Sequence, residues 1–120
     1  MTVRFQRFED MKAWKMADQM ALDIYKIFKE NRDYGFKDQI QRAAVSVMNN
    51  IAEGFERNSK KAFISYLYIA KGSCGEVRSL LTLGCQLGYF NHAQFEQLSS
   101  NAVEISKMLY GLISELSKID

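Results

Sequence analysis

Apolar side chains recur at three- and four-residue intervals along four long stretches of this chain, and short polar segments separate the stretches. In the first stretch the apolar positions are Trp14, Ala17, Ala21, Ile24, Tyr25 and Phe28. Because an α-helix turns once every ~3.6 residues, this spacing places them on one helical face. Proline, which breaks helices away from their first turn, is absent from all 120 residues. The pattern therefore predicts an all-α protein made of long amphipathic helices.

The polar segments between these stretches indicate where the helices begin and end. The sequence predicts helices over residues 8–30, 36–57, 60–87 and, from a cap at Asn91, to about residue 118. Residues 31–35 and Asn58-Ser59 are turns by composition, and Gly88 ends the third helix. Short connections pack successive helices as antiparallel neighbours. We therefore expect one domain over residues 1–120, an antiparallel up-down-up-down four-helix bundle.

The sequence also predicts the compartment in which the chain works. No run approaches the ~20 apolar residues that span a bilayer, and residues 1–10 are too polar for a signal peptide. Cys74 and Cys85 lie ~16 Å apart along one expected helix, at ~1.5 Å per residue, which is too far for a disulfide. We expect both cysteines to be buried as small apolar residues in a cytoplasmic protein without a membrane partner.

The expected third helix carries two apolar faces. One consists of Phe63, Tyr66, Leu67, Ala70, Cys74, Val77 and Leu81, and the other of Ile69, Gly72, Ser73, Glu76, Leu80, Leu83 and Leu87. The first helix repeats the feature weakly with Met16, Met20 and Ile27. A surface helix of a monomer needs one apolar stripe, so the second face meets either another helix of the same bundle or a neighbouring subunit. We expect self-association, with an interface formed by Ile69, Leu80, Leu83 and Leu87.

Catalytic and metal-binding patterns are missing from the sequence. The single histidine, His92, has no glutamate three residues before it, as a di-iron bundle requires. Cys74 and Cys85 are three helical turns apart and do not form a zinc cluster. Gly72 and Gly75 lie inside a helical pattern and do not form a phosphate-binding loop. The sequence therefore predicts a protein that is not an enzyme, with no catalytic residue, no metal and no cofactor.

A polar face on the expected second helix is the remaining candidate for chemistry. Its members, together with two residues of the third helix within reach, are Arg42, Ser46, Asn50, Glu53, Ser73 and Glu76. Glu53 and Glu76 are candidates for a carboxylate pair, but no histidine, metal cluster or nucleophile is expected beside them, which favours a structural role over catalysis. Every member of a buried polar network must find a partner, so such a network fixes helix register. We interpret these residues as a structural network that sets register and subunit pairing.

The segment from Arg42 to Gly54, RAAVSVMNNIAEG, closely resembles the signature of the four-helix-bundle proteins known as 23S rRNA intervening-sequence proteins. The resemblance continues in residues 8–11 with Trp14 and in residues 69–76, and Met48 is a departure within the signature. It implies subunits that assemble as a homopentameric ring. It also extends to the accessory proteins of diversity-generating retroelements, which share this fold and bind nucleic acid and a reverse transcriptase.

Two basic helix faces provide candidate contacts to nucleic acid. Lys60, Lys71 and Arg78 lie on the third helix with Tyr68 beside them, and Lys12, Lys15 and Lys26 lie on the first. Electrostatic binding grows with the number of phosphates contacted, and an oligomer repeats both faces. We therefore predict an oligomer that binds RNA or DNA. The alternative, favoured by a net charge of only +2, is a scaffold or protein-partner adaptor whose docking would be insensitive to salt.

Overall fold

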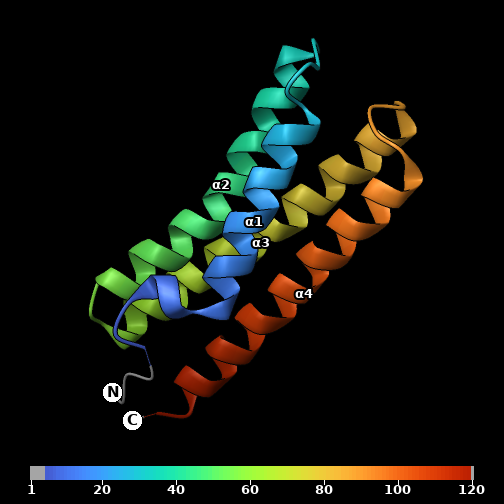
Figure 1. The fold of residues 1–120 in the computed structure, drawn as a ribbon. Coiled ribbons are helices and arrows are strands. Elements are labelled where there is room, and N and C mark those ends of the chain that lie inside the picture. The colour runs from blue at the N-terminus through green and yellow to red at the C-terminus, as the bar shows by residue number, and fades with distance from the viewer. Residues whose placement is uncertain (1–4, 120) are drawn as a thin grey trace.

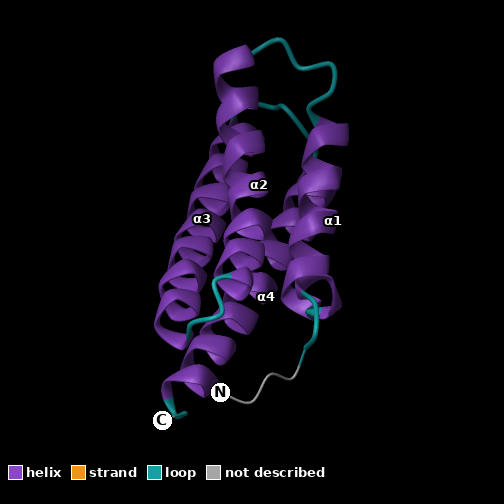
Figure 2. Cartoon of the chain, turned by 90° about the vertical axis from the view of Figure 1, so that its left-hand side faces the viewer, coloured by secondary structure: helices purple, strands orange, loops and turns teal. Residues whose placement is uncertain are grey.

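The computed structural model describes residues 5–119, and these residues form one short 3-10 helix and four α-helices without a strand (Figure 1, Figure 2). In chain order the elements are η1 (Phe8–Asp10), α1 (Lys12–Ile27), α2 (Tyr34–Glu56), α3 (Lys60–Gln86) and α4 (His92–Ser117). The bundle is elongated, with extents of 48 × 20 × 20 Å. The prediction of an all-α four-helix bundle is confirmed.

The first helix differs most from its predicted bounds of residues 8–30. Met11 adopts an extended conformation (φ −76°, ψ 128°) that separates η1 from α1, and its side chain is buried. At the other end α1 stops at Ile27, and the ring of the next residue, Phe28, is fully buried. Both departures from the predicted helix therefore coincide with apolar side chains that enter the core.

Polar side chains cap three of the helices. Asp33 accepts a hydrogen bond from the N–H of Phe36 (3.2 Å), which starts α2 at Tyr34 rather than at residue 36. Ser59 caps α3. Asn91 and Gln94 form a reciprocal capping box at the start of α4 (2.8 and 2.9 Å). These caps satisfy amide groups that have no partner inside the helix.

Gly88 ends α3 through a Schellman motif. It takes a left-handed backbone conformation (φ 78°) that side-chain-bearing residues disfavour. The N–H of Gly88 donates to the carbonyl of Cys85 (3.0 Å), and the N–H of Tyr89 donates to the carbonyl of Gly84 (3.0 Å). The predicted stop at this glycine is confirmed.

Each α-helix contacts two others. α2 and α4 both pack against α1 and against α3, whereas α1 and α3 do not touch each other within residues 5–119 and lie on the diagonal of the bundle. At one end the phenol of Tyr89 reaches Asp33, which joins the α1–α2 and α3–α4 connections. At the other end the ammonium group of Lys60 donates to the backbone carbonyl of Ile119, so the start of α3 lies beside the end of the chain (Figure 1).

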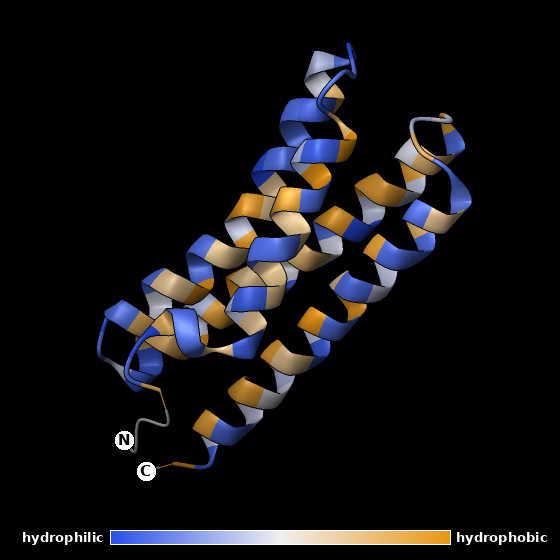
Figure 3. Cartoon of the chain, in the orientation of Figure 1, coloured by the Kyte–Doolittle hydropathy of each residue, from blue (hydrophilic) through white to orange (hydrophobic). Residues whose placement is uncertain are grey.

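Hydrophobic and hydrophilic positions alternate along every helix, and the hydrophobic ones form a continuous core (Figure 3). Its largest fully buried side chains are Phe28, Met11, Met20, Ile24, Ile40, Ile51, Leu67, Leu81, Ile105, Leu109, Val47 and Val77. One prediction for α1 is wrong, because Tyr25 is 47% exposed. Met20, on the second apolar face of α1, is fully buried within the chain, because α1 packs against both α2 and α4.

The two cysteines have different environments. Cys74 is fully buried, and burial raises the pKa of its thiol to about 12, so it acts as a small apolar residue. Cys85 is only half-buried, contrary to prediction. Among residues 5–119, no helix combines the length and the hydropathy needed to cross a lipid bilayer.

Candidate nucleic-acid interface

The basic face of α3 is only partly accessible. Lys60 is half-buried and donates to the carbonyl of Ile119, and Lys71 is also half-buried. Arg78 is exposed, and Tyr68 is 55% exposed. Two of the three cations on this face are therefore constrained by the bundle itself.

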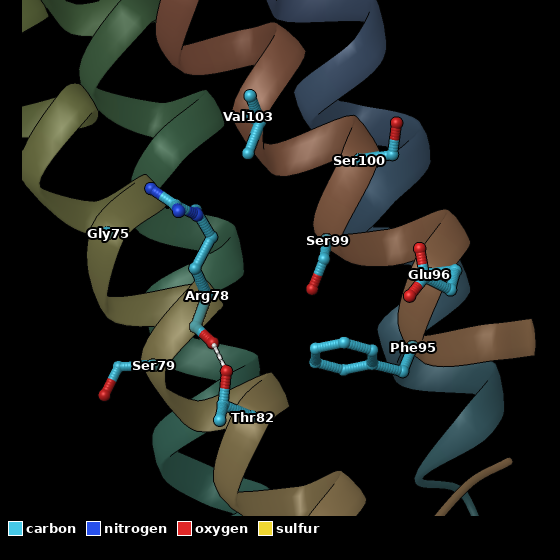
Figure 4. Close-up of a pocket in the computed structure, with 9 residues that line it drawn as sticks. All are labelled: Gly75, Arg78, Ser79, Thr82, Phe95, Glu96, Ser99, Ser100 and Val103. Carbon is cyan, nitrogen blue, oxygen red and sulfur yellow. Dashed lines mark hydrogen bonds between the residues drawn. The ribbon is translucent and has the colours of Figure 1, made fainter. Parts of the chain in front are cut away.

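Arg78 lies in a groove between α3 and α4 with a volume of about 470 Å³ (Figure 4). The lining is rich in hydroxyl groups and comprises Gly75, Arg78, Ser79, Thr82, Phe95, Glu96, Ser99, Ser100 and Val103. Figure 4 shows the Arg78 side chain extending between the two helices, whereas Ser79 and Ser100 point away from the facing helix. The guanidinium group is suited to bind phosphate, but the carboxylate of Glu96 in the same lining offsets part of its charge.

The basic face of α1 is open to solvent. Lys12, Lys15 and Lys26 are all exposed, and within residues 5–119 none of them is ion-paired with a carboxylate. Because α1 and α3 are diagonal, their outward faces point to opposite sides of the subunit. One subunit therefore cannot present both basic faces to one short nucleic-acid segment.

Three members of the predicted structural network meet between α2 and α3. The hydroxyl groups of Ser46 and Ser73 are 2.9 Å apart, and Ser73 is buried. The amide of Asn50 donates to the backbone carbonyl (2.7 Å) and to the hydroxyl (2.9 Å) of Ser46. The bond between Ser46 and Ser73 connects the two helices, and the bonds from Asn50, which lie within α2, hold the Ser46 side of that contact in place.

The other three members of the predicted network lie apart from this cluster. Arg42 pairs with Asp38 on the surface (3.6 Å). Glu76 is exposed and makes no hydrogen bond or ion pair within residues 5–119. The structure therefore does not bring Glu53 and Glu76 together as a carboxylate pair.

Glu53 instead belongs to a second α2–α3 contact. It accepts hydrogen bonds from Arg57 (2.7 Å) and from the phenol of Tyr66 (3.1 Å), and these bonds lower the pKa of its carboxyl group. The guanidinium carbon of Arg57 lies 5.3 Å from the centre of the Tyr66 ring, in a cation–π arrangement. All of these groups lie near the surface, where ion pairs contribute little to stability. The cluster therefore mainly helps to define how α2 and α3 are aligned.

An apolar surface runs along the outside of α3. Ile69, Leu83 and Leu87 are 51, 45 and 50% exposed, and Leu80 is half-buried against the core. Three of the four residues expected at a subunit interface are thus accessible in the single chain. Isolated exposed leucines are ordinary, but their recurrence along one helix is typical of an interaction face.

The side chains that commonly bind metal ions do not converge in the part of the chain that the structure describes. No cluster of three or more His, Cys, Asp or Glu side chains is placed to hold a metal ion among residues 5–119. His92 is exposed and lies 3.2 Å from Glu96, one turn further along α4.

Two features escaped the sequence analysis. Gly54 allows α2 to approach α3, because a Cβ at this position would lie 2.6 Å from the Cβ of Tyr66. A glycine inside a helical apolar pattern was the available signal. At the opposite end, Asp33 accepts a hydrogen bond from the phenol of Tyr89 (2.5 Å), which lowers the pKa of Asp33 and raises that of Tyr89. No sequence pattern pairs residues so far apart.

The four helices, with small residues and a polar cluster between α2 and α3, define a four-helix-bundle protein. The family model described as 23S rRNA-intervening sequence protein matches residues 9–111. The chain belongs to this family, as its sequence signature predicted.

A solved structure supports the same assignment. A protein of unknown function from the S23 ribosomal protein family of Bacteroides thetaiotaomicron VPI-5482 is 28% identical in sequence, with a TM-score of 0.79. The match covers 84% of this chain and 97% of that chain. No curated protein matches the chain.

Proposed function

We propose that this protein is not an enzyme and that it works as a self-associating, nucleic-acid-binding four-helix bundle. The observation that carries the proposal is that four basic side chains on the outer faces of α1 and α3 are free to meet phosphates. Lys12, Lys15 and Lys26 of α1 and Arg78 of α3 are exposed, and none of them is ion-paired with a carboxylate among residues 5–119. Such surface cations are available to phosphates and release counterions on binding.

The assembly that we propose is a homopentamer of antiparallel up-down-up-down bundles in the cytoplasm. The shared ends of the helix connections support the antiparallel course. The exposed side chains of Ile69, Leu83 and Leu87 support self-association, because burying apolar surface stabilises subunit contacts. Repetition of the basic faces around a ring would strengthen binding, since each subunit adds phosphate contacts.

The direct test is the solution mass by light scattering, with and without a structured RNA, at low and moderate salt. We expect a mass of about five chains and an RNA complex that dissociates as salt rises. A pentamer that ignores RNA at low salt would refute the nucleic-acid part of the proposal, and a monomer would refute the assembly.

The apolar face of α3 favours a second candidate, a scaffold that docks a protein partner. An apolar interface is held mainly by burial of surface and is little affected by salt. A complex with a protein partner that persists at high salt, in the absence of RNA binding, would favour this candidate.

A further inference from the structure

We infer that the outer face of α1, rather than that of α3, takes up the nucleic acid; this inference rests on the proposed function above. The face is the α1 lysine ridge, formed by Lys12, Lys15, Lys26 and, in the turn after the helix, Lys29. All four side chains are exposed, and none is ion-paired with a carboxylate within residues 5–119.

The lysines of this ridge extend along most of α1. Lys12 and Lys26 lie ~21 Å apart along the helix, at ~1.5 Å per residue, which is long enough for several phosphates of one strand. The two acidic residues of α1, Asp18 and Asp23, are half-buried, and Asp23 lines a groove with Lys26. Asp23 accepts a hydrogen bond from Gln19 (2.9 Å). The exposed charged side chains of α1 are therefore lysines.

The basic face of α3 is less suited to the same task. Lys60 is engaged with the carbonyl of Ile119, and Arg78 shares its groove with Glu96. The same helix also exposes Ile69 and Leu83, which the proposed assembly covers. Because α1 is diagonal to α3, its ridge points away from that subunit contact and stays accessible.

An anionic lipid surface would also attract lysines, but α1 lacks a free apolar face. A helix that lies in a membrane interface needs such a face to enter the acyl region. The apolar residues of α1, including Ala17, Met20 and Ile24, are buried in the core. Leu22 and Tyr25 are the large apolar side chains that its described residues expose. Nucleic acid is therefore the better fit.

The test replaces Lys15, Lys26 and Lys29 together with glutamine and titrates a labelled, unstructured single-stranded RNA by fluorescence anisotropy over a salt series. We expect at least tenfold weaker binding at low salt. The slope of log affinity against log salt should fall by about 2, since each lost phosphate contact on a single strand removes ~0.7. Single-stranded DNA of the same length is titrated in parallel and should respond equally.

The matched control replaces Lys61, Lys107 and Lys118 with glutamine, which removes the same charge from exposed lysines outside both basic faces. It should bind within a factor of about three of the unmodified protein. Unchanged helicity and light-scattering mass in both triple variants exclude misfolding as the cause.

Three outcomes would overturn the inference in different ways. Loss of binding in the control variant but not in the α1 variant refutes the ridge and leaves the proposed function standing. No binding of RNA or DNA by the unmodified protein refutes both. Lysine-dependent binding to vesicles containing phosphatidylserine, without binding to RNA, replaces nucleic acid by a membrane surface.

Discussion

The seam between α2 and α3 and the seam between α1 and α4 belong to one bundle but are packed differently. In the α2–α3 seam the two backbones approach closely, with Gly54 against Tyr66 and the hydroxyl groups of Ser46 and Ser73 at 2.9 Å. A groove of about 530 Å³ opens only at the end of this seam, where α2 gives way to α3 beside Phe55, Ser59 and Phe63. The α1–α4 seam holds two open grooves of about 430 and 280 Å³. Met108 and Leu112 line the larger one, together with Gly111.

The difference shows which side chains allow two helices to approach closely. In the α2–α3 seam, small residues let the two backbones approach, and hydrogen bonds fix the register. In the α1–α4 seam, long side chains such as Met108 separate the helices, and Gly111 has no atom within 4 Å of a Cβ placed on it. We therefore expect matched substitutions to affect the free energy of unfolding more strongly in the α2–α3 seam.

The largest contrast should come from truncating one large apolar side chain in each seam. Phe63 is buried, with its ring 6.0 Å from that of Phe55, whereas Met108 is only half-buried. Phe63→Ala should lower the free energy of unfolding by about 3–4 kcal/mol, and Met108→Ala by about 1 kcal/mol. Urea denaturation at one fixed protein concentration measures both, because assembly shifts apparent stability. Equal losses would show that the seams are packed alike.

A smaller contrast, of opposite sign, should come from adding a methyl group to one glycine in each seam. Gly54→Ala forces its Cβ against that of Tyr66, and we expect a net loss of about 1–2 kcal/mol despite the better helix propensity of alanine. Gly111→Ala meets no atom and should gain about 0.5–1 kcal/mol. Thermal unfolding by circular dichroism gives the sign. A stabilised Gly54→Ala variant would contradict the close approach.

The polar cluster of the α2–α3 seam should contribute less than its packing. Asn50→Leu removes two hydrogen bonds to Ser46 and should cost about 1–2 kcal/mol, and we expect smaller or aggregated species by light scattering. Glu76→Ala, which removes an exposed side chain, should change subunit stability by less than about 0.5 kcal/mol. A change of mass in Glu76→Ala alone would assign that carboxylate to subunit pairing.

The smallest effect should be a pH dependence at the rim of the α2–α3 seam. Hydrogen bonds from Arg57 and then from Tyr66 lower the pKa of Glu53 below its ordinary value of 4.5. A carboxyl group whose pKa is lowered by folding stabilises the folded state above pH 4.5. This stabilisation is lost as the pH falls through the lowered pKa. The Tm of Glu53→Gln should therefore lie slightly below that of the unmodified protein at pH 7 and should match it at low pH. A difference that does not depend on pH would contradict this assignment.

Features that depend on neighbouring residues were predictable from the sequence. The caps at Ser59 and Asn91 and the stop at Gly88 act within one turn of helix, so local composition was sufficient. The buried stripes of α2 and α3 were predicted from the three- and four-residue spacing of apolar side chains. The signature segment around Asn50 identified the family.

Features that depend on which faces meet were not predictable in the same way. Periodicity places Ser46 and Asn50 on one face of α2. Whether Ser73 or Glu76 of α3 meets that face depends on the rotation of each helix about its own axis, which the sequence pattern does not give. The breaks at Met11 and Phe28 likewise arise because burial of these side chains outweighs continuation of the helix.

The sequence by itself therefore determined four amphipathic helices, most of their ends and the family, because hydrogen bonds and apolar repeats within a helix span only a few residues. The tertiary structure decided that α1 and α3 are diagonal, which places the lysines of α1 and the exposed leucines of α3 on opposite sides. Pairing of helices depends on contacts between residues far apart in the chain, where the fit of whole surfaces determines the arrangement.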